Sequence, residues 1–188
     1  RVIFFLPTFT PTIAVAIVWM LIFAPDGLFD TMMRALSWTV PGVLTDQTLA
    51  MQAVVVVSLW AGVGYNTVLF NAALDMVPAS YLEAARIDGA TAWDRFWRIR
   101  LPLISPTLFF GTVMTAITSL QVFDQIYVMT RGGPGSATAT LGYAVYQKGF
   151  QAFQMGYASS IAWVMFALIM ALTAMQFWLQ RKWVHYDN

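Results

Sequence analysis

The chain is poor in the residue types that most often do chemistry. Its 188 residues include no cysteine and one histidine, His185. The lack of cysteine excludes disulfides, thiol nucleophiles and zinc–cysteine sites, and one histidine cannot form a histidine metal cluster. The sequence also has no Gly-x4-Gly-Lys-[Ser/Thr] phosphate-binding loop and no paired carboxylates inside an apolar segment. We therefore expect a chain that is not an enzyme on its own, with no catalytic residue, no metal site and no bound cofactor.

Charge is also scarce. Charged residues make up only 10% of the chain, and the net charge is +1. No run of Lys and Arg could follow a phosphate backbone, so nucleic acid is not an expected partner. Hydrophobic residues reach 59% and the mean hydropathy is +0.66. Such a composition is far from that of a soluble domain and predicts an integral membrane protein in contact with lipid.

Apolar segments long enough to cross a bilayer occur four times, at about residues 2–24, 49–74, 102–129 and 156–179. In the first, Pro7 and Pro11 are expected to kink the helix or to move its start toward Thr10. No internal repeat or low-complexity linker separates the segments. The sequence therefore predicts one all-α, polytopic transmembrane bundle over 1–188. Because the chain begins at Arg1 inside an apolar stretch, we expect further helices upstream.

The distribution of basic residues predicts the orientation of this bundle. In an up-and-down arrangement, seven Lys and Arg residues fall on the side of the polar loop 75–101 and three on the other side. By the positive-inside rule, this loop and the C-terminus are cytoplasmic, and the connections 25–48 and 130–155 face outward. The seven are Arg1, Arg86, Arg95, Arg98, Arg100, Arg181 and Lys182, and the three are Arg34, Arg131 and Lys148.

Local signals within the loop 75–101 predict two short helices. Pro78 ends the preceding span, and Ser80 with Glu83 has the spacing of a capping box. Gly89 supplies a left-handed residue that ends the first helix. Thr91 with Asp94 repeats the cap spacing and predicts a second helix through Ile99. Taken singly, these residues are explained by helix punctuation alone.

Their full spacing is more specific. Glu83-Ala84-Ala85 is followed after three residues by Gly89, and after nine more by Ile99-x-Leu101-Pro102. This pattern resembles the EAA signature loop of the membrane subunits of bacterial ABC importers, and it matches at every fixed position. The resemblance implies a type I importer permease in the bacterial inner membrane, whose loop inserts into a separate ATPase subunit and couples it to transport. The coupling residues it implies are Glu83, Ala84, Ala85, Asp88 and Gly89.

A second stretch narrows the resemblance. The segment Thr130-Arg131-Gly132-Gly133-Pro134, with Tyr146, Phe150 and then Gly156-Tyr157-Ala158-Ser159, is similar to carbohydrate importers of the maltose and glycerol-3-phosphate type. The resemblance implies six core helices, about two of them upstream of Arg1. It also implies a second permease, two ATP-binding subunits carrying ATP and Mg, and an extracytoplasmic solute-binding protein. Residues 131–136 are a candidate contact for that binding protein, or a flexible solvated turn.

Polar residues inside two spans are candidates for the solute path, because polar groups in a bilayer are costly unless they serve a function. Interleaved with aromatic rings such as Trp60 and Phe123, their hydroxyl and amide groups suit an uncharged, hydroxyl-rich solute such as a sugar. Thr118, Gln121 and Gln125 are expected on one helical face. Each polar residue is alternatively explained as packing between helices. The candidates are Ser58, Gly62, Tyr65 and Asn66 in the second span and Thr118, Ser119, Gln121 and Asp124 in the third.

Two other functions stay open. The EAA loop is shared by importers of amino acids, phosphate and metals. Those solutes favour a charged pocket, however, and Asp124 is the only charged residue deep in a predicted span. A structural or chaperoning membrane protein with no solute path is the second alternative. It would require the signature spacing to be accidental.

Overall fold

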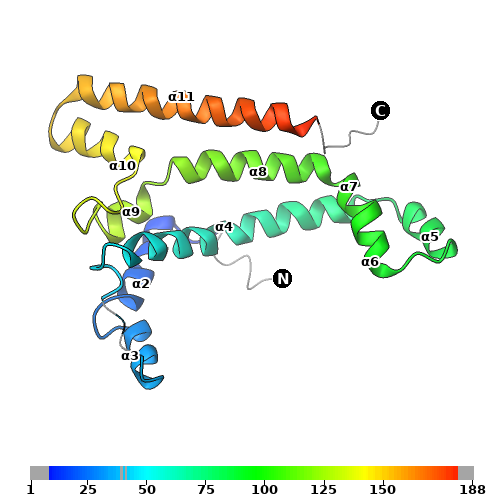
Figure 1. The fold of residues 1–188 in the computed structure, drawn as a ribbon, viewed down its shortest axis with the longest axis horizontal. Coiled ribbons are helices and arrows are strands. Elements are labelled where there is room, and N and C mark those ends of the chain that lie inside the picture. Colours follow the sequence, from blue (N-terminus) through cyan, green and yellow to red (C-terminus); the bar gives the residue numbers. More distant parts are fainter. Residues whose placement is uncertain (1–8, 39, 41, 182–188) are drawn as a thin grey trace.

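The computed structural model describes residues 9–38, 40 and 42–181, and within these ranges every regular element is helical (Figure 1). Short helices connect a few long ones, and two of the connecting segments are π-helical. The elements are α2 Thr12–Ile22, α3 Leu28–Ala35, α4 Leu49–Asp75, α5 Ala79–Ile87, α6 Ala92–Arg95, the π-helix η1 Phe96–Arg100, α7 Leu101–Leu103, α8 Ser105–Leu120, α9 Asp124–Met129, α10 Leu141–Tyr146, the π-helix η2 Gln147–Gln151, and α11 Met155–Gln180.

Three long apolar stretches form the body of the molecule. α4, α8 and α11 run alongside one another and alternate in direction (Figure 1). The stretches Leu49–Asp75, Ser105–Met129 and Met155–Gln180 contain 27, 25 and 26 residues and are apolar enough to cross a membrane. This confirms the predicted all-α, polytopic fold. α5 to α7 and the end of α11 lie at one end of the bundle, here called the coupling end, and α9 and α10 lie at the opposite, outer end.

The first predicted span is only partly described. α2 begins after Pro11, near the start that the two prolines favour, and contains 11 residues. At 1.5 Å per residue it is about 16 Å long, roughly half the thickness of the hydrocarbon core. Residues 1–8 of the predicted span lie outside the described residues. The described part of that span is therefore a short apolar helix, and a complete crossing over 2–24 stays a prediction.

The third predicted span is interrupted. Instead of one helix over 102–129, the backbone leaves helical geometry between Leu120 and Asp124. The Thr140 hydroxyl, 18 residues farther along the chain, donates to the freed carbonyl of Val122 over 2.9 Å. The expectation that Thr118, Gln121 and Gln125 share one helical face was therefore wrong, because the helix ends before Gln121 and restarts at Asp124.

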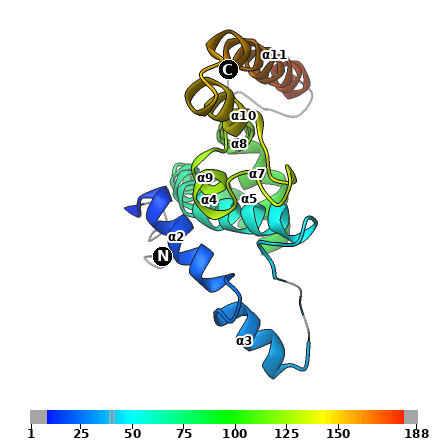
Figure 2. The same cartoon turned by 90° about the vertical axis from the view of Figure 1, so that its left-hand side faces the viewer.

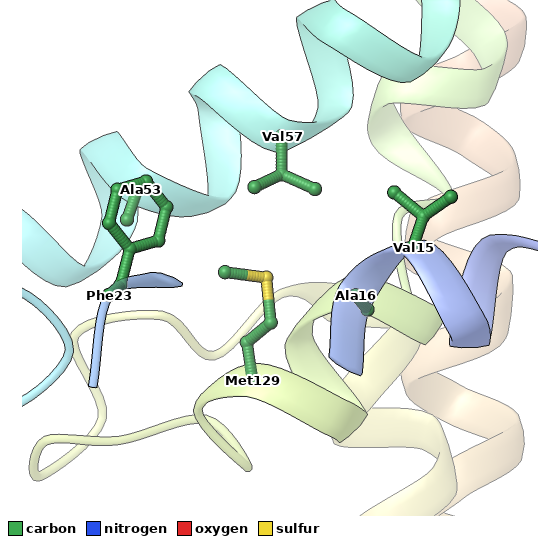
Figure 3. Packing of buried hydrophobic residues seen from close by; sticks show 6 residues of the cluster. All are labelled: Val15, Ala16, Phe23, Ala53, Val57 and Met129. Atoms are coloured by element: carbon green, nitrogen blue, oxygen red, sulfur yellow. The ribbon is translucent and has the colours of Figure 1, made fainter. Parts of the chain in front are cut away.

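The buried core lies at the outer end. Figure 3 shows Val57 of α4 and Met129 of α9 pointing toward one another, with Val15 and Ala16 of α2 beside them. Phe23 and Ala53 complete this cluster. α11, by contrast, has only 6% of its apolar window buried. The long helices therefore leave broad apolar faces uncovered by the described chain, as expected where lipid or other subunits surround them.

Candidate functional site

The polar loop projects beyond the ends of α4 and α8 (Figure 1). The predicted capping box of Ser80 and Glu83 is absent, and that expectation was wrong. α5 begins at Ala79 with Pro78 as its N-cap, and no side chain caps it. Ser80 is thus already inside the first turn, where its hydroxyl cannot take the N-cap role.

The second capping box is confirmed. The Thr91 hydroxyl accepts a hydrogen bond from the Asp94 amide over 3.2 Å, and the Asp94 carboxylate accepts one from the Thr91 amide over 3.3 Å. The hydrogen bonds from the Thr91 hydroxyl and amide hold the pKa of the Asp94 carboxyl below its usual value. The helix that starts here runs past the predicted end at Ile99, because η1 and α7 continue α6 without a break to Leu103.

The residues of the EAA pattern form an open surface at the coupling end. Glu83, Ala84, Asp88 and Gly89 are exposed, and Ala85 is half-buried. Gly89 has a φ of +79°, as its predicted role in ending α5 requires. A Cβ added at Gly89 would meet nothing within 4 Å, so the backbone conformation, not crowding within the described chain, calls for glycine there. Residues 83–89 thus form a small exposed projection, here called the knob, which ends in a turn at Gly89.

Two contacts set the register between α4 and α8. A Cβ built on Gly111 of α8 would lie 2.9 Å from the Phe70 ring of α4, so the two helices touch there. One turn nearer the outer end, the Asn66 side-chain amide donates to the Thr115 hydroxyl over 3.4 Å. Since the helices are antiparallel, a further turn places Gly62 opposite Ser119. A Cβ on Gly62 would meet nothing within 4 Å, so the close contact at Phe70 is not repeated there.

The predicted solute-path residues therefore separate into two groups. Gly62 and Asn66 share a face of α4 that is in register with Ser119 and its neighbour Thr118 on α8. The hydroxyls of Thr118 and Ser119 donate to backbone carbonyls one turn back in α8, and their lone pairs stay available. For the other four predicted residues, no described contact links the side chain to this face. Ser58 donates to the Val54 carbonyl over 2.8 Å, Tyr65 and Gln121 are exposed, and Asp124 is half-buried at the first turn of α9.

Sequence reasoning did not predict the contacts that join α4 to α8. Thr115 provides the interhelical hydrogen bond, and Gly111, four residues earlier, provides the close approach. Small residues spaced by four in an apolar helix are a recognised signal for helix contact. That signal was present, but the partner ring of Phe70 could not be identified without the fold.

The outer loop 130–140 is built from internal contacts. Thr138 is fully buried, and its hydroxyl bonds to the Thr130 hydroxyl over 2.7 Å and to the Gly133 carbonyl over 2.8 Å. Gly132 has a φ of +81°, and a Cβ there would lie 2.7 Å from the Tyr143 ring. Arg131 stays exposed at the loop surface. Residues 131–136 therefore lie in a turn held by internal contacts, and Arg131 is accessible at its surface.

Comparison with known families identifies the family to which the chain belongs. Residues 1–185 match the family described as the binding-protein-dependent transport system inner membrane component. The chain belongs to this family. Membership confirms the resemblance carried by the EAA spacing and makes the chain an inner-membrane permease component of ABC importers. Among the described residues, no group of three or more His, Cys, Asp or Glu side chains could hold a metal ion.

Curated relatives refine the match. The chain is 36% identical to the probable ABC transporter permease protein YesP of Bacillus subtilis, with 100% of this chain and 62% of the relative covered. It is 39% identical to the sn-glycerol-3-phosphate permease protein UgpA of Brucella abortus, covering 94% of this chain and 60% of the relative. It is 31% identical to the lactose permease protein LacF of Rhizobium radiobacter, covering 97% and 63%. The chain thus spans about three fifths of the length of these relatives, of which one is named for sn-glycerol-3-phosphate transport and one for lactose transport.

A solved structure supports the fold. The chain superposes with a TM-score of 0.85 on a chain of a bacterial ABC transporter involved in the import of the acidic polysaccharide alginate. The superposition covers 95% of this chain and 63% of the other, at 22% identity. A second structure of an alginate transporter, in complex with a periplasmic protein that carries an alginate pentasaccharide, gives 0.84. The helical arrangement of Figure 1 is therefore that of an ABC importer permease.

Proposed function

We propose that this chain is a membrane-spanning subunit of an ATP-driven ABC importer and forms part of the path for a sugar or sugar-like solute. The observation that carries the proposal is the exposed EAA knob at the end of a bundle with the permease fold. The importer would contain a second permease, two ATP-binding subunits with ATP and Mg, and a solute-binding protein. The names of the glycerol-3-phosphate and lactose relatives support a carbohydrate-like solute.

The knob would be the contact for the ATP-binding subunit. Ala84 and Ala85 allow close approach of a partner's groove, and Glu83 and Asp88 at the rim would fix its orientation. From Gly89 the chain runs through α6, η1 and α7 directly into α8. A displacement of the knob would therefore reach α8 along a nearly continuous helical path, as a rigid-body movement.

The solute would meet the face shared by α4 and α8. Gly62 leaves open space there, and Asn66, Thr118 and Ser119 supply amide and hydroxyl groups without charge. Such groups suit the hydroxyls of a sugar better than an ion. Ser58, Tyr65, Gln121 and Asp124 remain proposed path residues. Ser58, Gln121 and Asp124 lie toward the outer end, where the helix is interrupted after Leu120.

The proposed orientation places the coupling end in the cytoplasm. Arg86, Arg95, Arg98, Arg100 and Arg181 lie at that end, and Arg34, Arg131 and Lys148 at the other. The positive-inside rule supports this assignment. The outer loop with exposed Arg131 would then be accessible to a solute-binding protein on the outside.

The test is the ATPase activity of the full-length permease in its purified complex, reconstituted in lipid with the binding protein. A panel of mono-, di- and oligosaccharides and glycerol phosphates would be added one at a time. Stimulation by one of them supports the proposal and names the solute. A flat response, with the ATP-binding subunit still bound, would refute the carbohydrate assignment and leave the coupling role.

A variant pair tests the coupling role separately. Ala85→Arg, in the knob, is expected to lose the ATP-binding subunit during co-purification. Ala139→Arg is the matched control, because Ala139 is exposed at the opposite end of the bundle. Equal retention of the ATP-binding subunit by both variants would contradict the knob as its docking site.

A further inference from the structure

α3 is an amphipathic helix with one apolar face and one charged face. Leu28, Met32 and Leu36 follow one another at intervals of four residues and lie on one side. Their exposed fractions are 62%, 55% and 63%, and Trp38, directly after the helix, is 67% exposed. Four large apolar side chains thus stand open on one short segment, and none of the residues of α3 is buried.

The opposite side of α3 is charged but already paired. The Arg34 guanidinium contacts the Asp26 carboxylate at 2.7 Å and the Asp30 carboxylate at 2.6 Å. The hydrogen bond to Asp26, followed by the charges of Asp30 and Asp26, raises the pKa of Arg34 above its usual value. Since these charges satisfy one another, the polar face does not need a charged protein partner. It does need water, because the side chains of Arg34 and Asp26 are 60% and 78% exposed.

Both ends of α3 are closed by local hydrogen bonds. At the C-terminal end, the Trp38 amide donates to the Met33 carbonyl and the Ser37 amide to the Arg34 carbonyl, each over 2.9 Å. With Ser37 at a φ of +60°, this is a Schellman motif, which brings Trp38 back beside the helix. At the other end, the Asp26 amide donates to the Asp30 carboxylate over 3.1 Å. The helix ends are therefore defined by the sequence itself.

Such a helix still requires something to cover its apolar face. Eight residues are too few for a stable helix in water on propensity alone, so packing of the amphipathic face must contribute. Within the chain, Phe29 supplies one contact, an edge-to-face packing on Phe23 with ring centroids 5.6 Å apart. This anchors one edge of α3 and leaves the Leu28, Met32 and Leu36 face open.

The position of α3 indicates what covers that face. α3 lies at the outer end of the bundle and extends sideways from it, across the direction of α4, α8 and α11 (Figures 1 and 2). A helix placed at the end of the membrane spans and crosswise to them runs along the membrane surface. Tryptophan is enriched at that boundary, where its ring reaches the acyl chains and its N–H the headgroups.

We infer that α3 is an interfacial helix that lies in the lipid surface at the outer end of the permease. Leu28, Met32, Leu36 and Trp38 enter the boundary between headgroups and acyl chains, to a depth of about 5–10 Å. Asp26, Asp30 and Arg34 face the water. The inference depends on the membrane-spanning bundle and not on the solute, so it stands or falls independently of the proposed function.

Site-specific quenching tests the inference, with single cysteines introduced into this cysteine-free stretch of 188 residues and any cysteine elsewhere in the complex replaced. Met32→Cys, on the apolar face, and Thr31→Cys, on the polar face, are each labelled with an environment-sensitive fluorophore. The full-length permease is reconstituted with its partner subunits in vesicles. Quenching is then measured with nitroxide lipids labelled near the headgroup and, separately, with iodide in the water.

The expected result is a crossed pattern. The label at position 32 loses fluorescence to the nitroxide lipid and is protected from iodide, whereas the label at position 31 shows the reverse. Equal quenching of both labels by iodide would overturn the inference, because the apolar face would then be in water. Protection of position 32 from both quenchers would also overturn it, because protein would then cover that face. Ala139→Cys, in the outer loop, serves as the water-exposed reference.

Discussion

Replacing Gly111 by alanine should reveal how closely α4 and α8 pack. The added Cβ would lie 2.9 and 3.0 Å from two atoms of the Phe70 ring and 3.4 Å from a Leu69 methyl. Carbon atoms prefer separations of about 3.5–4.0 Å, so the ring must move by roughly half an ångström or more. Overpacking of this kind costs about 1–3 kcal/mol.

Gly62→Ala is the matched control on the other helix. Both glycines lie inside long helices, so each alanine gains about 1 kcal/mol of helix propensity. At Gly62 nothing lies within 4 Å of the new Cβ, and no clash offsets this gain. We therefore expect Gly62→Ala to be neutral or stabilising, and Gly111→Ala to be less stable than Gly62→Ala by about 1–3 kcal/mol.

The assay is the unfolding free energy of the permease in a constant lipid or detergent environment, completed by a double-mutant cycle. Phe70→Leu shortens the side chain that Gly111→Ala meets, so Gly111→Ala should cost less in the Phe70→Leu background than in the wild type. Equal stabilities of the two alanine variants, or a Gly111→Ala cost unchanged by Phe70→Leu, would show that the helices do not touch at Gly111.

Three further predictions concern the loops. Gly89→Ala should reduce the solute transported per ATP, since an L-residue in the left-handed region costs about 1–2 kcal/mol, whereas Gly89→Asn should retain more because asparagine tolerates that region; equal losses would exclude a conformational cause. The lowered pKa of Asp94 means that its capping box stabilises α6 above the unfolded pKa of about 3.9 and loses this contribution as the pH falls through the folded-state pKa. Hydrogen-exchange protection of the residue-91 amide, which donates to the Asp94 carboxylate, should therefore drop below about pH 4, and Thr91→Val should weaken this pH dependence because the hydroxyl bond is lost while the amide bond remains; an acid transition of unchanged size in Thr91→Val would contradict the assignment. Thr138→Val keeps the shape of the side chain but leaves the Gly133 carbonyl unpaired, at a cost of about 1–3 kcal/mol, whereas Thr138→Ser should be milder. Faster proteolysis of the outer loop in Thr138→Val than in Thr138→Ser is the measurement, and equal rates would argue against the buried hydrogen bond.

Local signals predicted the features that depend on near neighbours in sequence. The Thr91 capping box, the left-handed Gly89 and the polar loop between two apolar helices all follow from residues within a few positions of one another. Ser80 shows the limit of such signals. Pro78 competes for the same helix start, and a proline that fixes its own φ and needs no N–H partner can begin the helix two residues earlier.

The features that depend on distant residues could not be predicted. The sequence reads as one apolar segment over 102–129, and the interruption between α8 and α9 is stabilised by Thr140, which lies 18 residues beyond Val122. Likewise, the sequence could name the polar residues of α4 and α8 as candidates, but their register follows from the Phe70 contact with Gly111. Helical periodicity places residues on a face of their own helix and says nothing about which residues lie opposite.

The two ends of α8 are held very differently. At the coupling end, the helical segments α6, η1 and α7 lead almost without interruption from the knob into α8, so backbone hydrogen bonding connects the two. At the outer end, the interruption is joined to α10 by side chains: the Thr140 hydroxyl donates to the Val122 carbonyl, and the Phe123 ring packs on Tyr143 and Tyr146. If the knob moves as proposed, α8 would transmit the displacement to this packed outer end, where the side chains of Phe123 and Thr140 would have to adjust.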